Sequence, residues 1–250
     1  MIHYHGTPLS PTRVAIRFFT GRHAMISFRH PEQVDLLAPV VQTYVVDNGA
    51  FSAWATGEPI TDWQPYYKWV DDQKHHPAFE WGIIPDVING TEDDNLALIR
   101  QWPHEKHFGV PVWHANESLD FLKLLVGEWP RVCIGSSDEF QVIGAKKWWD
   151  RISRAMDVIC DASGYPKAKL HGLRMLSGKI VKKLPLNSAD STNVSLHYRD
   201  VMKRDKIPGL AAAEILGMRV ENVPTAEKWE GMTQLTFPGT TESPNDKDGY

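Results

Sequence analysis

The chain has 250 residues, with 27 Lys and Arg against 31 Asp and Glu, which gives a formal net charge of −4 at pH 7. This balance excludes a globally basic nucleic-acid coat protein but allows a local basic face. The two cysteines, Cys133 and Cys160, are too few for a disulfide framework or a cysteine-rich zinc site. The sequence shows neither a secretory signal nor an apolar run of ~18 residues, so we expect a cytoplasmic protein without a membrane partner.

Short apolar runs, each bounded by turn-forming residues, follow one another along the chain. They cover residues 24–28, 43–46, 81–84, 110–113, 132–134, 170–173 and 186–188, with a weaker eighth run at 217–220. Helix-like segments lie between them, at 31–42, 91–100, 117–127, 148–156 and 207–216. Buried strands that alternate with helices predict an α/β fold, a TIM-type (β/α)₈ barrel. A doubly wound open sheet is the alternative, but no Gly-x-Gly-x-x-Gly follows the first run.

The domain organisation follows from the same pattern. Residues 1–237 are expected to form one barrel domain that begins with an N-terminal extension. Residues 238–250 are polar and rich in turn formers, so we expect them to be a flexible C-terminal tail.

Polar residues follow the predicted strands where the strand ends of a barrel would meet. In chain order they are Asp47, Asp86, His114, Gly135, Ser136 and Asp190. A single Asp at a strand end is most often a helix cap or turn residue. Three on one rim indicate a site, because barrels carry their active sites at the carboxyl ends of the strands. Carboxylates that lie close together also raise one another's pKa, which suits acid–base chemistry.

At these residues the chain resembles a known family. The segment Asp47-Asn-Gly-Ala-Phe-Ser resembles the Asp-Ser-Gly-Gly-Phe-Gln motif of the tRNA-guanine transglycosylase superfamily. Ala189-Asp-Ser is similar to the segment that holds the family's nucleophile, and the rim positions between them follow the family's order. The resemblance covers roughly residues 43–193. It is strongest to the short phage and bacterial branch that inserts 7-deazaguanine bases into DNA, which implies a location in a bacterial or phage-infected cell.

Some features depart from the family. The zinc motif near the family's C-terminus is absent, so we expect no zinc-binding subdomain, no metal and no cofactor. Ala50, Ser52 and His114 stand where the family has Gly, Gln and Gln.

The resemblance implies a role for each rim residue. Asp190 would attack the sugar carbon C1′ as a nucleophile, and Asp47 would act as general acid and base. The other implied positions bind the base: Asp86 as acceptor, Gly135 and Ser136 as backbone donors, Phe51 as stacking platform, Leu173 or Met175 closing from above, and His114 as a donor in place of an amide. A plain structural role for His114 is an equal alternative.

The implied partners are a polymer and a free base. The polymer is DNA or tRNA, and the base is a 7-deazaguanine such as the cyano-substituted one. Backbone phosphates need cations, and the best candidates are Lys179, Lys182 and Lys183, between the sixth run and Asp190. The oligomeric state is open.

Three other functions compete with base exchange. Tyr4-His5-Gly6-Thr7 resembles the His-Gly-Thr start of some ADP-ribosyltransferases, which would make NAD the substrate. A hydrolytic N-glycosidase could use the same two carboxylates, with water in place of the incoming base. A non-catalytic nucleic-acid-binding module is disfavoured, because acidic side chains on the rim would repel a phosphate polymer.

Overall fold

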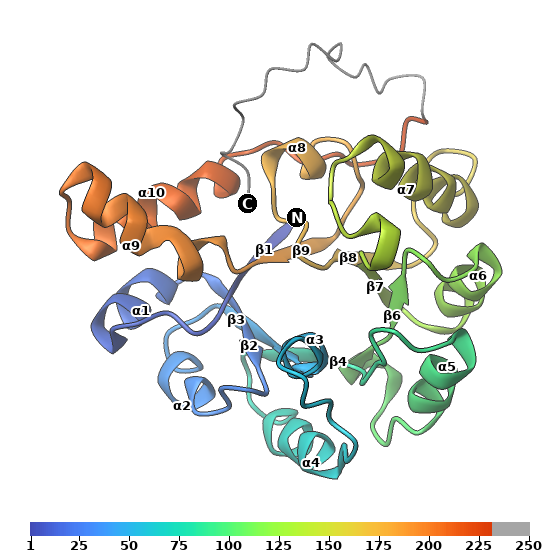
Figure 1. The fold of residues 1–250 in the computed structure, drawn as a ribbon, viewed down its shortest axis with the longest axis horizontal. Coiled ribbons are helices and arrows are strands. Elements are labelled where there is room, and N and C mark those ends of the chain that lie inside the picture. The colour runs from blue at the N-terminus through green and yellow to red at the C-terminus, as the bar shows by residue number, and fades with distance from the viewer. Residues whose placement is uncertain (232–250) are drawn as a thin grey trace.

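The structure, a computed structural model, describes residues 1–231 and contains one parallel sheet (Figure 1). Its nine strands are β1 (Ile2–Gly6), β2 (His23–Ser27), β3 (Thr43–Asp47), β4 (Phe79–Ile83), β5 (Gly109–Val110), β6 (Val112–His114), β7 (Arg131–Gly135), β8 (Lys169–Gly172) and β9 (Ser188–Ser191). Hydrogen bonds join them in the order β5-β4-β3-β2-β1-β9-β8-β7-β6. The predicted barrel is therefore confirmed as a single-domain α/β TIM-type barrel.

Pro111 explains why nine strands fill eight positions. Proline has no N–H to donate, so it interrupts the ladder between β5 and β6. Its carbonyl still accepts a hydrogen bond from Cys133 of β7 at 2.8 Å, while Val110 pairs with Ile83 of β4. The two short strands thus act as one bent strand that closes the barrel.

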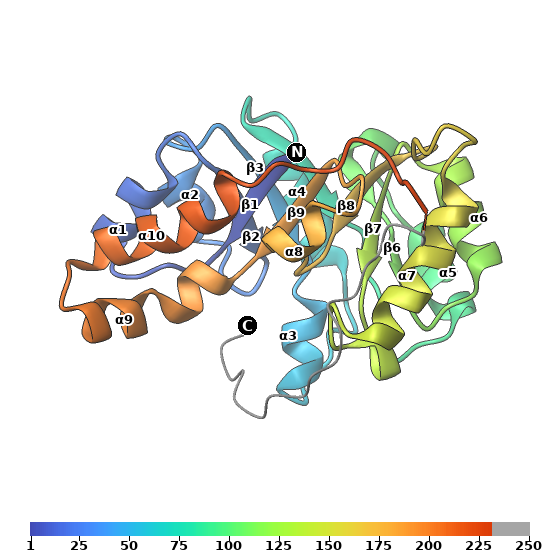
Figure 2. The ribbon, with the colours of Figure 1, turned by 90° about the horizontal axis from the view of Figure 1, so that it is seen from above.

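Most of the helices surround the sheet on its outer side, and the short helix that follows β3 lies over the end of the barrel (Figure 1, Figure 2). The helices are α1 (Thr12–Phe19), α2 (Gln33–Leu37), α3 (Ala50–Ala55), α4 (Gln64–Gln73), α5 (Glu92–Arg100), α6 (Leu119–Glu128), α7 (Lys146–Ile159), α8 (Gly178–Val181), α9 (Asn193–Asp205) and α10 (Gly209–Glu221), with short 3₁₀ turns at Lys106–Phe108 and Asp138–Phe140. The start of α5 is a reciprocal cap, because Thr91 and Asp94 each accept a hydrogen bond from the other's backbone N–H. None of the helices in residues 1–231 is long and apolar enough to cross a membrane.

Two sequence predictions about the barrel strands are wrong. Residues 2–6 are not an extension but the strand β1, in which Tyr4 faces the interior and His5 faces the helices. The strand was missed because polar histidines alternate with its apolar residues. The weak run at 217–220 lies inside α10, where Gly217 packs on Phe18 of α1. The predicted tail, 238–250, lies outside the described residues.

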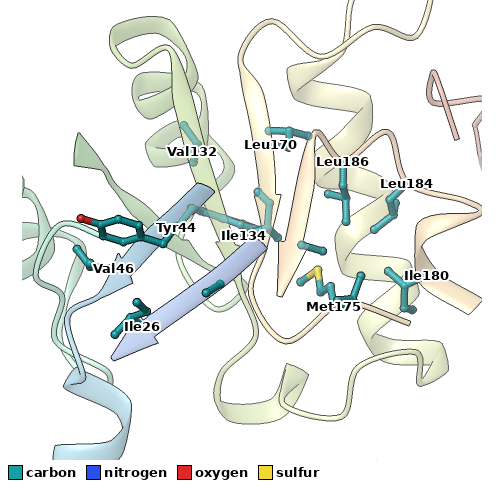
Figure 3. Close-up of a cluster of buried hydrophobic side chains, with 14 of the residues drawn as sticks. Ile26, Tyr44, Val46, Val132, Ile134, Leu170, Met175, Ile180, Leu184 and Leu186 are labelled. Atoms are coloured by element: carbon teal, nitrogen blue, oxygen red, sulfur yellow. The ribbon is translucent and has the colours of Figure 1, made fainter. Parts of the chain in front are cut away.

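Apolar side chains form two separate cores. The outer core lies between the sheet and the helices, and Figure 3 shows part of it around Ile180, Leu184 and Leu186. The inner core fills the barrel and includes Tyr4, Trp81 and Cys133. The interior is therefore packed, as in other barrels of this size, and ligands can enter only at its ends.

Candidate active site

Strand register places the rim residues on the inner face of the barrel. Residues paired across parallel strands lie on the same face of a sheet. Asp190 pairs with Tyr4, whose ring lies in the inner core, so the carboxylate of Asp190 also faces inward. Asp47 ends β3 and pairs with Ser27, and His114 ends β6 and pairs with Gly135. The strands thus present these side chains to one end of the barrel.

The carboxyl group of Asp47 has a raised pKa. Burial, followed by the negative charges of Asp190 and Asp86, raises the pKa of Asp47 to about 7. Gly49 donates its backbone N–H to Oδ2 of Asp47 at 3.2 Å, which opposes the rise. Gly49 adopts a left-handed φ of 77°, a conformation that glycine takes without steric cost. At neutral pH a large fraction of Asp47 therefore carries a proton.

Asp190 is held through one of its two oxygens. Oδ1 accepts the backbone N–H of Arg174 at 2.9 Å and lies 3.3 Å from Nε2 of His171. Burial lowers the pKa of His171, which is fully enclosed, so the ring is neutral. With Ser188 2.9 Å from Nδ1, a neutral ring can donate from Nε2 to Asp190 and accept at Nδ1. This arrangement fixes the carboxylate while its Oδ2 accepts no hydrogen bond from residues 1–231.

Asp86 is anchored at both oxygens. Asn48 donates to Oδ1 at 2.8 Å, and Nε2 of His114 lies 2.9 Å from Oδ2. Burial alone would lower the pKa of His114, but the hydrogen bond and charge of Asp86 raise it above its ordinary value. His114 and Asp86 therefore form a buried ion pair when the imidazole is protonated. Since each carboxylate oxygen has two lone pairs, Asp86 can still accept from a ligand.

Glu117, in the loop after β6, and Asn95, on α5, support this pair. Glu117 accepts the backbone N–H of His114 at 2.7 Å and the side-chain amide of Asn95 at 2.8 Å. Asn95 in turn accepts the backbone N–H of Val87, next to Asp86. The loops after β4 and β6 are thereby tied together. Sequence reasoning missed this support, since a Glu three residues after a strand end looks like an ordinary helix-start residue.

Gly135 and Ser136 are buried beside His114. A side chain at position 135 would lie 3.2 Å from Nδ1 of His114, so the glycine leaves room for the ring. The hydroxyl of Ser136 accepts the indole N–H of Trp148 at 2.8 Å and is turned toward α7. Only the backbone of this segment is therefore available at the mouth.

Phe51 and Leu173 lie at the mouth, but in different settings. Phe51 on α3 is 47% exposed, and the guanidinium of Arg174 lies 4.9 Å from the centre of its ring. Leu173 is half-buried and packs against the inner core. Figure 2 shows α3 standing at the end of the barrel, beyond the surrounding helices. Arg174 was not among the predicted site residues.

Met175 is a correction to the predicted site. Its side chain is fully buried in the outer core, beside Ile180 and Leu184 (Figure 3), so it cannot cover a base from above. The chain turns between Gly172 and Met175, so positions 173 and 175, which would share a face in a continuous strand, point to opposite sides of the sheet. Position 175 faces the helices, whereas position 173 faces the barrel.

The three predicted phosphate-binding lysines differ in exposure. Lys179 and Lys182 are exposed on and just after α8. Lys183 is half-buried, with its ammonium group 5.3 Å from the ring centre of Trp149, so part of its function is to cover α7.

His5 has a structural setting that does not fit the ADP-ribosyltransferase alternative. Its ring lies in the helix layer, 5.0 Å from the ring of Phe18, and its Nε2 lies 2.9 Å from Glu221. It therefore points away from the mouth and could not hold a nicotinamide ribose there.

In residues 1–231 no group of three or more His, Cys, Asp or Glu side chains is placed to hold a metal ion.

Comparison with known proteins identifies the fold alone. No family model and no curated protein matches the chain. A mutant tryptophan synthase α-subunit from Pyrococcus furiosus is similar in structure, with a TM-score of 0.52 and 13% identity over 88% of this chain and 95% of that one. A putative fructose-1,6-bisphosphate aldolase from Coccidioides immitis has a TM-score of 0.51 and 10% identity, over 88% and 89%. Identity this low carries no information about activity.

Proposed function

We propose that this protein is an enzyme, a transglycosylase that exchanges guanine in a nucleic acid for a 7-deazaguanine base. The observation that carries the proposal is the setting of Asp47, where burial, followed by the charges of Asp190 and Asp86 at the same barrel mouth, raises its pKa to about 7. Base exchange without strand cleavage needs a nucleophilic carboxylate and a neighbouring carboxyl group that can both give and take a proton.

The reaction is a double displacement at C1′ of the target nucleotide. Oδ2 of Asp190 attacks C1′, a C1′–O bond forms, and the C1′–N bond to guanine breaks. Protonated Asp47 gives its proton to the departing base. The incoming base then loses a proton to the Asp47 carboxylate and attacks C1′, which breaks the ester and restores Asp190. Two displacements retain the configuration at C1′ and leave the strand intact.

The other rim residues account for base selection. Asp86, held by Asn48 and His114, accepts from the N–H groups of a guanine-like edge. In this proposal, the backbone N–H groups of Gly135 and Ser136 bind the base carbonyl, and Phe51 stacks on the ring of the base. A buried acceptor rejects bases that lack the matching donors, because it would be left unpaired.

The polymer that we propose is DNA, with tRNA as the alternative. C1′ of a stacked nucleotide is inaccessible, so the target must be extruded into the mouth. Lys179 and Lys182 provide exposed positive charge on the segment that follows Arg174.

The test is incubation of the protein with radiolabelled guanine and either DNA or tRNA. We expect label in one polymer, with Asp190→Asn reducing incorporation by at least about 10³-fold. Asp93→Asn, at an exposed position in the first turn of α5, is the matched control and should incorporate label at the wild-type rate.

Other products would identify a different function. Abasic sites without incorporated label would establish the hydrolytic N-glycosidase, for which the same carboxylates serve. Polymer binding with neither product, unchanged by Asp190→Asn, would contradict the proposal and indicate a binding module.

A further inference from the structure

Arg174 connects three parts of the mouth that come from different elements. Its backbone N–H donates to Oδ1 of Asp190 at 2.9 Å, and its Nη2 donates to the carbonyl of Ser136 at 2.9 Å. Its guanidinium also lies 4.9 Å from the ring centre of Phe51. One residue on the loop between β8 and α8 thus reaches β9, the loop after β7, and α3.

The backbone of Arg174 is in a conformation that few side-chain-bearing residues adopt. Its φ is 57°, in the left-handed region, where Cβ crowds the following carbonyl. This conformation directs the N–H of Arg174 to Asp190 and its side chain across the mouth. Strained residues of this kind are maintained where the surrounding structure requires them. The requirement here is the simultaneous contact with Asp190 and Ser136.

The side chain of Arg174 occupies a position that a base would use. The planar guanidinium lies over Phe51, 4.9 Å from the centre of its ring, where the proposed function places the base, and it presents N–H groups, as the edge of guanine does. Phe51 is nevertheless 47% exposed, so the guanidinium can leave the ring without breaking a core contact. Arg174 is itself exposed, and its only side-chain hydrogen bond within residues 1–231 is the one to Ser136.

We propose that Arg174 is a nucleotide-binding residue that covers Phe51 in the empty site and binds a phosphate of the target strand once a base has entered. This proposal rests on the proposed function. The base of the extruded nucleotide displaces the guanidinium from Phe51, and the freed cation turns to the backbone that this nucleotide brings to the mouth. Arginine suits both states, because its planar group stacks on rings and forms paired hydrogen bonds with phosphate.

The test separates the two states with two probes. Free guanine reports the Phe51 face, and a DNA duplex with one abasic site, bound in the presence of saturating free guanine, reports phosphate binding by the displaced guanidinium. In Arg174→Gly, which keeps the N–H to Asp190 and removes the strain, we expect guanine to bind about two- to fivefold more tightly, because no cation must be displaced. The slope of log affinity for the abasic duplex against log salt should shrink by about 0.9, the contribution of one phosphate contact.

Two further variants distinguish this role from a general charge effect. Arg174→Lys should restore the wild-type salt slope. Arg17→Ala, an exposed arginine on α1, should change neither measurement. Weaker guanine binding in Arg174→Gly would show that Arg174 holds the base directly and would overturn the proposal, as would an unchanged salt slope. Guanine binding by neither wild type nor Arg174→Gly would overturn both this proposal and the proposed function.

Discussion

Asp47 and Asp190 face the same mouth but have different neighbours. Burial and the charges of two other carboxylates raise the pKa of Asp47 to about 7, and the carboxyl group accepts one backbone N–H. Asp190 is fixed by the backbone of Arg174 and by neutral His171. Carboxyl groups with such different surroundings divide the roles of acid and nucleophile between them. At the residue scale, the proposed chemistry therefore depends on the burial of Asp47 and on the charges of Asp190 and Asp86.

The raised pKa of Asp47 predicts opposite pH dependences for the two half-reactions. Release of guanine needs protonated Asp47, so kcat/KM for the polymer should fall tenfold per pH unit above about 7. Uptake of the free base needs ionised Asp47, so kcat/KM for the base should rise with pH. The midpoint of that rise should lie below 7, because esterified Asp190 carries no charge and no longer raises the pKa of Asp47.

Initial-rate measurements from pH 5 to 9, with each substrate varied in turn, check this prediction. Asp93→Asn is the control and should show both pH dependences of the wild type. If kcat/KM for the polymer and kcat/KM for the base change in the same direction with pH, Asp47 does not transfer the proton in both steps.

At the element scale, the order of strands and rim residues was predictable, whereas the direction of single side chains was not. Asp47, Asp86, His114 and Asp190 could be found because each polar residue follows an apolar run. β1 could not, because alternating histidines hide its pattern. We expected Met175 at the mouth, but Arg174 lies there instead. The difference comes from a turn after β8 that the sequence does not specify. The His114–Asp86–Asn48 cluster depends on contacts between loops far apart in the chain.

The histidine on β1 belongs to an ion-pair network that fastens α10 to the barrel. Arg22 donates to Glu221 at 2.7 Å and to Glu214 at 2.6 Å, and His5 lies 2.9 Å from Glu221. The hydrogen bonds from His5 and Arg22 lower the pKa of Glu221 to about 2, against an ordinary 4.5. This network joins the last described helix to the first strand and the loop after α1.

Removing the charge of Glu221 should therefore destabilise the fold without affecting the mouth. Because the pKa of Glu221 is lowered in the folded protein, its charge stabilises the fold above pH 4.5, and this stabilisation is lost as pH falls toward 2. For Glu221→Gln we expect a loss of about 2 kcal/mol in the free energy of unfolding at pH 7. The pKa shift of Glu221 corresponds to ~3 kcal/mol. The expected loss is smaller, because the pair is partly exposed and solvent screens its charges.

Urea denaturation at pH 7 and at pH 3 measures this loss, which should be smaller at pH 3. Glu227→Gln, at an exposed position, is the control and should match wild type at both pH values. A loss of equal size at both pH values would show that the effect comes from packing rather than from the charge.

At the scale of the whole molecule, the proposed substrate must be bound against an unfavourable net charge. The chain carries −4, and the mouth itself holds three carboxylates. Binding of a phosphate polymer therefore requires cationic side chains near the mouth. Lys179 and Lys182 are exposed on and just after α8, on the segment whose start is held by the hydrogen bond from Leu176 to the carbonyl of Asp190. Lys183 contributes less, since it also packs on Trp149.

Reversing the two exposed charges should weaken polymer binding while leaving base binding unchanged. For Lys179→Glu with Lys182→Glu, the salt slope of DNA affinity should fall by about 1.8, the contribution of two phosphate contacts. Arg13→Glu with Arg17→Glu makes the same change in net charge on the exposed side of α1, so it separates a local contact from the overall charge. Fluorescence anisotropy with labelled DNA between 50 and 200 mM salt measures both double variants. If both lose the same affinity, the polymer responds to net charge alone and α8 is not its contact surface.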